Sequence, residues 1–424
     1  MRLQQLHTRV EDDLTDSESQ SRLYSSQSEP EAATDDDARK SRFTRTRGRE
    51  LDRLPKLIDS LALCYLAAVL MHVPMSLGQL QTWVNDGGII YYSAIGEVPH
   101  HMLCKLPGEY HQPLQPSVML KSDDLQRAVA ALAIAYEREF NLEFPPINYP
   151  PLLFYFIQSL ALPLDIYGEV KTLAAKTTYD FRLPSYKVRA VLHPRDFPEA
   201  QLMALIIIAV KIAYPFEETN QNPMAANNAA TTALDWNAWT EALQDYKENT
   251  RRSEKLEYKQ CLGVTEDSIF RMDDQQIDDY LDWYGQEFSS PIIHEHKNDF
   301  RRALLEIFPY TSKPALDSST RANQATTEPA MNNRLKKVLS SLRYRETTTE
   351  AQDGSNSTSR LPGSNYRMVC KIQELDGHGK VFITECADLI GMSVSRLLRA
   401  VFYTEKRLNN WVKDDGKEAS RETI

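Results

Sequence analysis

Four aspartates have a spacing that could hold a metal ion. Asp273, Asp274, Asp278 and Asp279 form two pairs one helical turn apart, and Asp274 and Asp278 would lie on one side of a helix. Carboxylate oxygens bind Mg²⁺ in this way in helical prenyl-transfer enzymes. The DDxxD spacing of those enzymes is not met, because Ile277 occupies the required place. Solvated carboxylates on the outer face of an amphipathic helix explain the cluster better, so we predict no metal site there.

The histidines and cysteines do not complete a catalytic or metal site either. His294 and His296 form an HxH pair, which together with the distant Cys386 falls short of the four ligands of a zinc site. His100 and His101 are adjacent and point in different directions in any regular structure. A nucleophile elbow, a P-loop, GxGxxG and HExxH are all missing. We therefore predict no catalytic residue, no cofactor and no small-molecule substrate.

Two groups of basic residues are candidates for contact with nucleic acid. The segment NNRLKKVLSSLRYR contains no acidic residue and could neutralise phosphates. In ITECADLIGMSVSRLLRAVFYTEKRLNNWVK, Ala387, Gly391 and Leu397 occupy the small, turn and apolar positions of a helix-turn-helix. An ordinary helical hairpin with basic residues facing water is the alternative. The candidates are Arg334, Lys336, Lys337, Arg343 and Arg345 in the first group, and Arg396, Arg399, Lys406 and Arg407 in the second.

The overall composition narrows the class of protein. The chain has 424 residues and a net charge of −10, which argues against a protein that binds polyanions over its whole surface but permits a local basic face. None of its five cysteines is spaced as CxxC, so a zinc ribbon is excluded and a reducing compartment is favoured over a disulfide framework. The N-terminus has no apolar core of the signal-peptide type.

One stretch is far more apolar than the rest of the chain. Between Leu202 and Ala213 only Lys211 is not apolar. A bilayer span needs about twenty apolar residues, so this stretch and a second one from Leu61 to Met71 are too short to cross a membrane. A helix that is apolar on nearly every face belongs at the centre of a globule, with other helices packed around it.

The helical periodicity predicts an all-α fold. Residues 51–216 contain five or six amphipathic segments, and no alternating strand pattern competes with them. A helix wrapped by neighbours is the plan of the cyclin fold, although a generic α-bundle also fits the pattern. The short basic run from Arg39 to Arg49 is either a solvated linker or an arm for nuclear targeting or nucleic-acid contact.

Changes in composition divide the chain into seven segments. We predict a disordered tail (1–50), a first cyclin-like domain (51–217), a linker (218–232), the first part of a second cyclin-like domain (233–310), a disordered insert (311–365), a C-terminal helical segment (366–413) and a final tail (414–424).

Several blocks, in this order, are similar to one known family. LPKLIDSLALCYLAAVLMHVPMSLGQLQTWVNDGGIIYYSAI, INYPPLLFYFIQSLALPLDIYGEVKTLA, FPEAQLMALIIIAVKIAYPF and IDDYLDWYGQEF together resemble the fungal TFIIB-like subunit of the RNA polymerase I core factor. The resemblance covers residues 54 to about 290, and weakly the C-terminal helices. Members of that family begin with a Cys-rich zinc ribbon, whereas residues 1–50 contain no cysteine, so we expect no bound zinc here.

The resemblance implies two tandem cyclin-like folds that act by contact and catalyse no step. It implies a nuclear and nucleolar factor whose partners are other core-factor subunits, TBP, RNA polymerase I and the ribosomal DNA promoter. Two alternatives stay open. A cyclin-type regulator of a protein kinase would suit the fold, although its MRxxL-like first helix is replaced here by LPKLIDSLALCYL. A helical Mg²⁺ enzyme would use Asp274 and Asp278.

Overall fold

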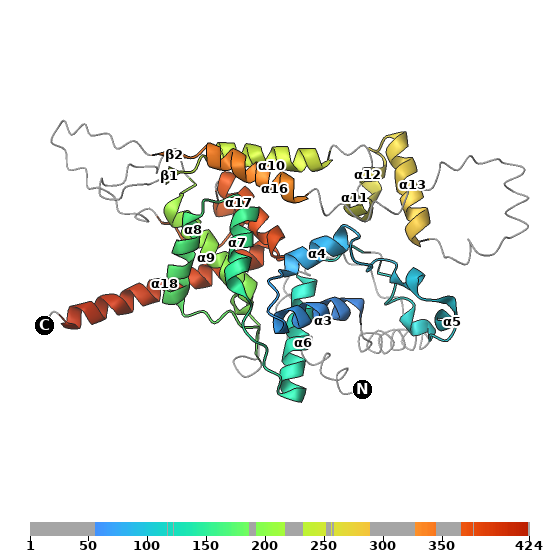
Figure 1. Cartoon of the computed structure of the whole chain (residues 1–424), viewed down its shortest axis with the longest axis horizontal. Coiled ribbons are helices and arrows are strands. Elements are labelled where there is room, and N and C mark those ends of the chain that lie inside the picture. Colours follow the sequence, from blue (N-terminus) through green and yellow to red (C-terminus); the bar gives the residue numbers. More distant parts are fainter. Residues whose placement is uncertain are drawn as a thin grey trace, which may run out of the picture.

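The computed structural model describes most of the chain between residues 56 and 422. The predicted tail 1–50 lies outside the described residues, and so does the linker 218–232 apart from Thr232. The described part is helical (Figure 1), which confirms the all-α prediction, and its one sheet is a two-residue antiparallel ladder. The described ranges are 56–116, 118–121, 123–185, 192–216, 232–251, 256, 258–288, 327–344, 366–375 and 377–422.

The helices begin and end close to the places that the sequence marks. Pro74 follows the first helix, and prolines lie in the first turns of the helices that begin at Tyr149 and Pro198. The helices of the N-terminal half are α3 (Leu57–Leu70), α4 (Leu77–Asn85), α5 (His100–Leu103), α6 (Asp124–Phe140), α7 (Tyr149–Ser159), α8 (Asp165–Thr177) and α9 (Pro198–Ala213), with the 3-10 turns η1 (Ala94–Glu97), η2 (Gly108–Tyr110) and η3 (Pro194–Asp196).

The second half of the chain adds shorter helices and the ladder. β1 (Thr232–Ala233) pairs with β2 (Arg343–Tyr344), which joins two segments that are distant in sequence. The other elements are α10 (Trp236–Arg251), α11 (Tyr258–Leu262), α12 (Glu266–Ile269), α13 (Asp274–Phe288), α16 (Thr327–Ser340), η6 (Ile372–Glu374), α17 (Gly377–Leu389) and α18 (Val394–Glu422). Because α18 continues to Glu422, the prediction of a tail from residue 414 was wrong; extending a formed helix avoids the cost of nucleation.

α9 is the central helix of the molecule, as its composition predicts. Every residue from Leu202 to Val210 is at most 2% exposed, and the side chains of Lys211 to Ala213 are partly exposed. α8 and α18 pack along α9, and α3 and α4 meet its first turn at Glu199. Burial of each large apolar side chain contributes about 1.5 to 3 kcal/mol, so α9 organises the surrounding core.

The C-terminal helices belong to this same core. Leu397 and Val401 of α18 are buried, and α18 packs directly on α9 (Figure 1). The side chain of Gln126 on α6 donates to the backbone oxygen of Ile390 in the α17–α18 turn over 3.2 Å. Segment 366–413, which the sequence predicted as separate from the first domain, covers α9 in the structure, because an all-apolar helix requires packing on every side.

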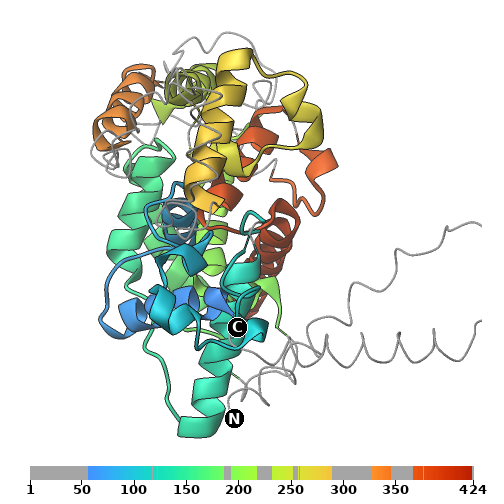
Figure 2. The same ribbon diagram turned by 90° about the vertical axis from the view of Figure 1, so that its right-hand side faces the viewer.

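α16 corrects the prediction of a disordered insert at 311–365. This helix packs between α7 and α10, and Figure 2 again shows the orange α16 beside the yellow-green α10. Val338 is fully buried, and Leu335 is packed against the core. The Ser, Thr and Asn content of the insert predicted disorder. Within it, however, apolar residues recur at helical spacing, and they form the buried side of α16. Residues 311–326 and 345–365 lie outside the described residues.

None of the helices in the described ranges is both long and apolar enough to cross a bilayer.

Candidate nucleic-acid interface

The second group of predicted basic residues lies on α18, after the turn at Gly391. Gly391 has a φ of 60°, in the left-handed region that favours glycine, so the predicted helix, turn and helix do form. Ala387 and Leu397 are fully buried, and their packing explains the small and apolar positions without any DNA contact. Burial of one side of α18 leaves the other side exposed, and that side carries Arg399, Lys406 and Arg407.

Arg396 is held inside the protein and is not free for a phosphate. Its guanidinium lies 3.4 Å from Asp123 and 5.2 Å from the centre of the Phe197 ring. Burial lowers the pKa of Arg396, and the Asp123 carboxylate opposes that shift. Asp123 also accepts a hydrogen bond from the Ser393 amide. Arg396 therefore fixes the start of α18 against α6 and η3.

The three exposed residues differ in how they are held. Arg407 donates to the Thr178 hydroxyl over 2.7 Å, and its guanidinium lies 4.8 Å from the centre of the Tyr179 ring. Arg399 and Lys406 form no ion pair with any residue that the structure describes. All three keep donors available to an anion, because none of them faces a carboxylate at ion-pair distance within the described residues.

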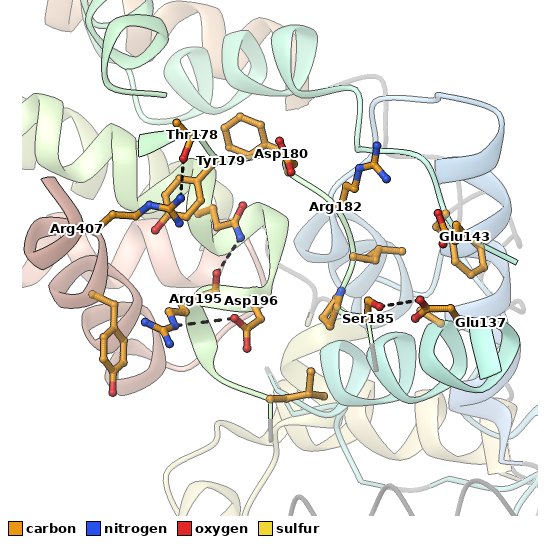
Figure 3. A pocket seen from close by; sticks show the side chains of 18 of the residues that line it. Glu137, Glu143, Thr178, Tyr179, Asp180, Arg182, Ser185, Arg195, Asp196 and Arg407 are labelled. Atoms are coloured by element: carbon orange, nitrogen blue, oxygen red, sulfur yellow. Dashed lines mark hydrogen bonds and ion pairs between the residues drawn. The ribbon is translucent and has the colours of Figure 1, made fainter. Parts of the chain in front are cut away.

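A cleft of about 760 Å³ lies beside this part of α18. Segment 178–185, η3 and the C-terminal part of α6 form it together with Tyr403, Lys406 and Arg407. Arg182 and Arg195 also line the cleft, and the Arg195 guanidinium lies 4.8 Å from the centre of the Tyr403 ring. Figure 3 shows Arg195 and Arg407 on the same side of the cleft.

The opposite side of the cleft is acidic. Glu137 is buried and accepts a hydrogen bond of 2.7 Å from the Ser185 hydroxyl. Glu143 lies on the same side in Figure 3, with Asp180 and Arg182 between the two sides. The basic side therefore attracts a phosphate backbone, whereas the acidic side repels it. A nucleic acid that contacts α18 would lie along its exposed face and would not enter the depth of the cleft.

The first predicted basic group is mostly engaged within the protein. The Arg334 guanidinium donates to the Ser159 carbonyl over 3.2 Å and lies 5.4 Å from the centre of the Trp239 ring. Lys337 lies 2.5 Å from Asp245 and 3.6 Å from Glu241.

Burial lowers the pKa of Arg334, which packs as part of the α16 interface with α7 and α10. Lys336 is exposed, Arg343 enters β2, and Arg345 lies outside the described residues. The structure therefore places α16 on α7 and α10 and places α18 on α8 and α9, so the two groups do not form one cluster.

The candidate catalytic residues do not converge. In the described part of the chain, no group of three or more His, Cys, Asp or Glu side chains is placed to hold a metal ion. Asp274 and Asp278 are exposed on α13, and His294 and His296 lie outside the described residues. Cys386 is fully buried, and burial raises the pKa of its thiol well above the usual value. A neutral buried thiol is a poor nucleophile and a poor metal ligand.

Arg182 and Arg195 are candidate residues that no sequence pattern predicts. Arg182 lies in a non-helical segment and Arg195 in the short 3-10 turn η3, and neither has a run of basic neighbours. Only the packing of η3 and segment 178–185 against α18 brings them to Arg407 and Lys406. No local signal in the sequence would have marked them.

Two family models match the chain. The model described as "Rrn7/TAF1B, N-terminal cyclin domain" matches residues 2–100, and "Rrn7/TAF1B, C-terminal cyclin domain" matches residues 118–288. Together these matches span more than half of the chain. The chain belongs to the Rrn7/TAF1B family. Membership confirms the two tandem cyclin domains that the resemblance implied. The models divide the chain between residues 100 and 118, so the predicted linker 218–232 falls inside the second model.

One curated protein and one solved structure are also similar to the chain. The Schizosaccharomyces pombe protein "RNA polymerase I-specific transcription initiation factor rrn7" is 25% identical over 283 residues, which is 64% of this chain and 50% of that protein. The chain thus spans about half the length of this curated relative of the Rrn7/TAF1B family. A chain in the crystal structure of the S. cerevisiae core factor is 14% identical, with a TM-score of 0.44 and coverage of 100% of this chain and 97% of that one. That TM-score is too low to support a functional comparison.

Proposed function

We propose that this protein is an RNA polymerase I initiation factor that works as a scaffold. In this role it is a core-factor subunit of the nucleus and nucleolus, and it assembles the initiation complex at the ribosomal DNA promoter. Its partners would be other core-factor subunits, TBP and RNA polymerase I. Membership of the Rrn7/TAF1B family is the observation that carries the proposal, and the name of the S. pombe relative supports it. The proposal assigns the chain no catalytic step and no cofactor.

The exposed face of α18 is the part of this scaffold that we assign to the DNA backbone. It carries Arg399, Lys406 and Arg407, whereas the nearby Arg195 of η3 lies 3.9 Å from the Asp196 carboxylate and is already paired. Lysine and arginine contacts to phosphates position a protein on a duplex without reading its sequence. The chain as a whole has a net charge of −10, and its acidic surfaces elsewhere would repel the duplex and so restrict it to this face.

The contact is tested by binding to a labelled duplex of the ribosomal DNA promoter. The triple variant Arg399→Gln, Lys406→Gln, Arg407→Gln is compared with a matched control that removes three exposed lysines elsewhere, Lys105→Gln, Lys259→Gln, Lys371→Gln. We expect the first variant to bind at least about tenfold more weakly. The slope of log K against log salt should fall by about 0.9 for each phosphate that the variant no longer neutralises. Equal affinities for the two triple variants would remove α18 from the DNA contact.

The scaffold role itself is tested by purification of the tagged chain from nuclear extract of its source. Recovery of the other core-factor subunits together with RNA polymerase I supports the role. Recovery of a cyclin-dependent kinase in their place would favour the alternative, a regulator of a kinase. The α18 variant should retain the protein partners, because its buried side is unchanged, so the DNA contact and the assembly role can fail separately.

A further inference from the structure

α13 is fixed to the body of the protein along one side. The Tyr258 hydroxyl donates to Glu287 Oε1 over 2.9 Å, and the Ser93 hydroxyl donates to the Glu287 carbonyl over 2.7 Å. The centres of the Tyr258 and Trp283 rings are 5.6 Å apart in an edge-on contact. These contacts set the rotation of the helix, and with it the side chains that face outward.

An aromatic and aliphatic stripe runs along α13 next to this fixed side. The Tyr284 ring stacks on Phe288 with 5.0 Å between the ring centres, and the Tyr280 ring is 6.3 Å from Tyr284. Leu281 and Tyr284 are 57% and 51% exposed. Exposed stripes of this kind in soluble proteins mark surfaces for association. The α13 stripe consists of Ile277, Tyr280, Leu281, Tyr284 and Phe288.

An acidic row lies beside the α13 stripe on the side away from the fixed contacts. Asp274, Asp278 and Asp282 follow one another at intervals of four residues, and all three are exposed or partly exposed. None of them forms an ion pair with a residue that the structure describes. Residues 258–288 contain more acidic than basic residues, so the whole region around α13 carries a negative charge.

We propose that the α13 stripe is a docking site for a basic amphipathic helix of a partner protein. Such a helix would place leucine-like side chains at helical spacing on Leu281 and Tyr284, and lysines or arginines against the acidic row. Aromatic anchors supply most of the affinity in interfaces of this kind, and charges at the rim set specificity and the rate of association. The proposal adds a protein-binding surface to the proposed scaffold role, separate from the basic face of α18.

The charges disfavour nucleic acid, anionic lipid and a second copy of the chain as occupants. The acidic row repels nucleic acid and anionic lipid surfaces, which attract basic residues. A second copy that presented the same face would bring the two acidic rows together, so self-association through this face is disfavoured. A basic helix is the occupant that neutralises the row and covers the apolar stripe at the same time.

The test measures binding of a synthetic peptide to the whole chain by fluorescence anisotropy. The probe is a short peptide with leucines at positions i, i+3, i+4 and i+7 and lysines on the flanking face. One control peptide has the same residues in scrambled order, and a second has glutamate in place of every lysine. We expect the probe to bind at least about tenfold more tightly than either control at about 0.1 M salt.

Variants of the protein locate the binding. Leu281→Ser with Tyr284→Ser should weaken binding of the probe at least about tenfold. Phe154→Ser with Leu164→Ser is the matched control, because these side chains are 51% and 62% exposed on other elements. Asp278→Asn with Asp282→Asn should weaken binding and reduce its salt dependence. Circular dichroism melts of all the variants establish that each is folded.

Three results would overturn the proposal. The first is a Kd for the probe peptide that is the same for the Leu281 and Tyr284 variant, the Phe154 and Leu164 control and the original protein. The second is equal affinity for the lysine and glutamate peptides, which would exclude a role for the acidic row. The third is a dimer in sedimentation that the Leu281 and Tyr284 variant dissociates, which would assign the stripe to a second copy of this chain. None of these measurements involves DNA, so the α18 proposal stands or fails separately.

Discussion

Lys211 Nζ lies 2.6 Å from Glu405 Oε1, which joins the central helix α9 to α18 by an ion pair that is almost completely buried. Lys211 also donates to the Arg367 carbonyl over 2.9 Å, and its ammonium group lies 4.3 Å from the centre of the Tyr366 ring. Lys211, the one charged residue in the apolar stretch, therefore contacts both the C-terminal helix α18 and the segment before η6.

Replacement of Lys211 by Met should destabilise the fold. The substitution keeps the aliphatic packing but leaves Glu405 buried without its cation, which typically costs about 3 to 5 kcal/mol. Urea denaturation measures the loss, with Lys380→Met on the exposed face of α17 as the control. The double variant Lys211→Met, Glu405→Met should recover most of the stability, because no charge then stays buried. If the double variant is as unstable as the single one, packing and not charge holds α18.

A charge in the middle of α9 should prevent folding of the core. Ala209 is 1% exposed, so Ala209→Asp places a carboxylate where no cation or water can reach it. The loss should exceed about 4 kcal/mol, which is among the largest effects of single substitutions. Ala175→Asp, on the partly exposed side of α8, serves as the control. A thermal melt of Ala209→Asp that matches the original protein would contradict the buried position.

Glu199 should make the stability depend on pH near neutrality. It accepts hydrogen bonds from the Tyr65 hydroxyl and the Leu77 amide over 2.7 and 3.0 Å. Burial raises the pKa of Glu199 from 4.5 to about 7, although both hydrogen bonds oppose that shift. Between these two values the folded state binds more protons than the unfolded state, so the free energy of unfolding falls as pH rises.

The loss should amount to on the order of 3 kcal/mol between pH 4.5 and pH 7, with no further change above pH 7. Glu199→Gln should remove this slope, because an amide does not titrate, whereas Glu139→Gln on the exposed end of α6 should keep it. Denaturant unfolding at a series of pH values makes the comparison. An identical pH profile for Glu199→Gln would show that this carboxyl does not control the slope.

Gly78 allows the α17–α18 turn to pack on α4. A Cβ atom at this position would lie 2.0 Å from the Leu389 carbonyl oxygen, a backbone atom that cannot move aside without displacing the turn. Gly78→Ala should therefore destabilise the protein by about 1 to 3 kcal/mol through overpacking. Gly168→Ala on α8 meets no atom within 4 Å and should stabilise the helix by about 0.5 to 1 kcal/mol. Thermal melts that move in the same direction for both variants would contradict the close approach.

The helices could be predicted because their signals are local. Prolines, caps and apolar spacing within one segment specify α3, α6, α7, α8 and α9, and the composition of residues 202–213 alone requires a central position. The average composition of the insert predicts disorder and gives no sign of α16, although the spacing of Leu335 and Val338 carries the helical signal.

The roles of the charged residues were decided by tertiary structure. The sequence alone does not show which of the nine basic candidates are free to bind a phosphate. In the structure Arg334 packs on Trp239, Lys337 pairs with Asp245, and Arg396 pairs with Asp123. Arg182 and Arg195 line the cleft beside α18 although no basic neighbour marks them in the sequence.

Periodicity is a property of neighbouring residues, so the amino-acid sequence by itself determined the helices and the buried position of α9. Whether a cation is free to bind a phosphate depends on carboxylates and aromatic rings that approach it from distant segments, and only folding brings those groups together.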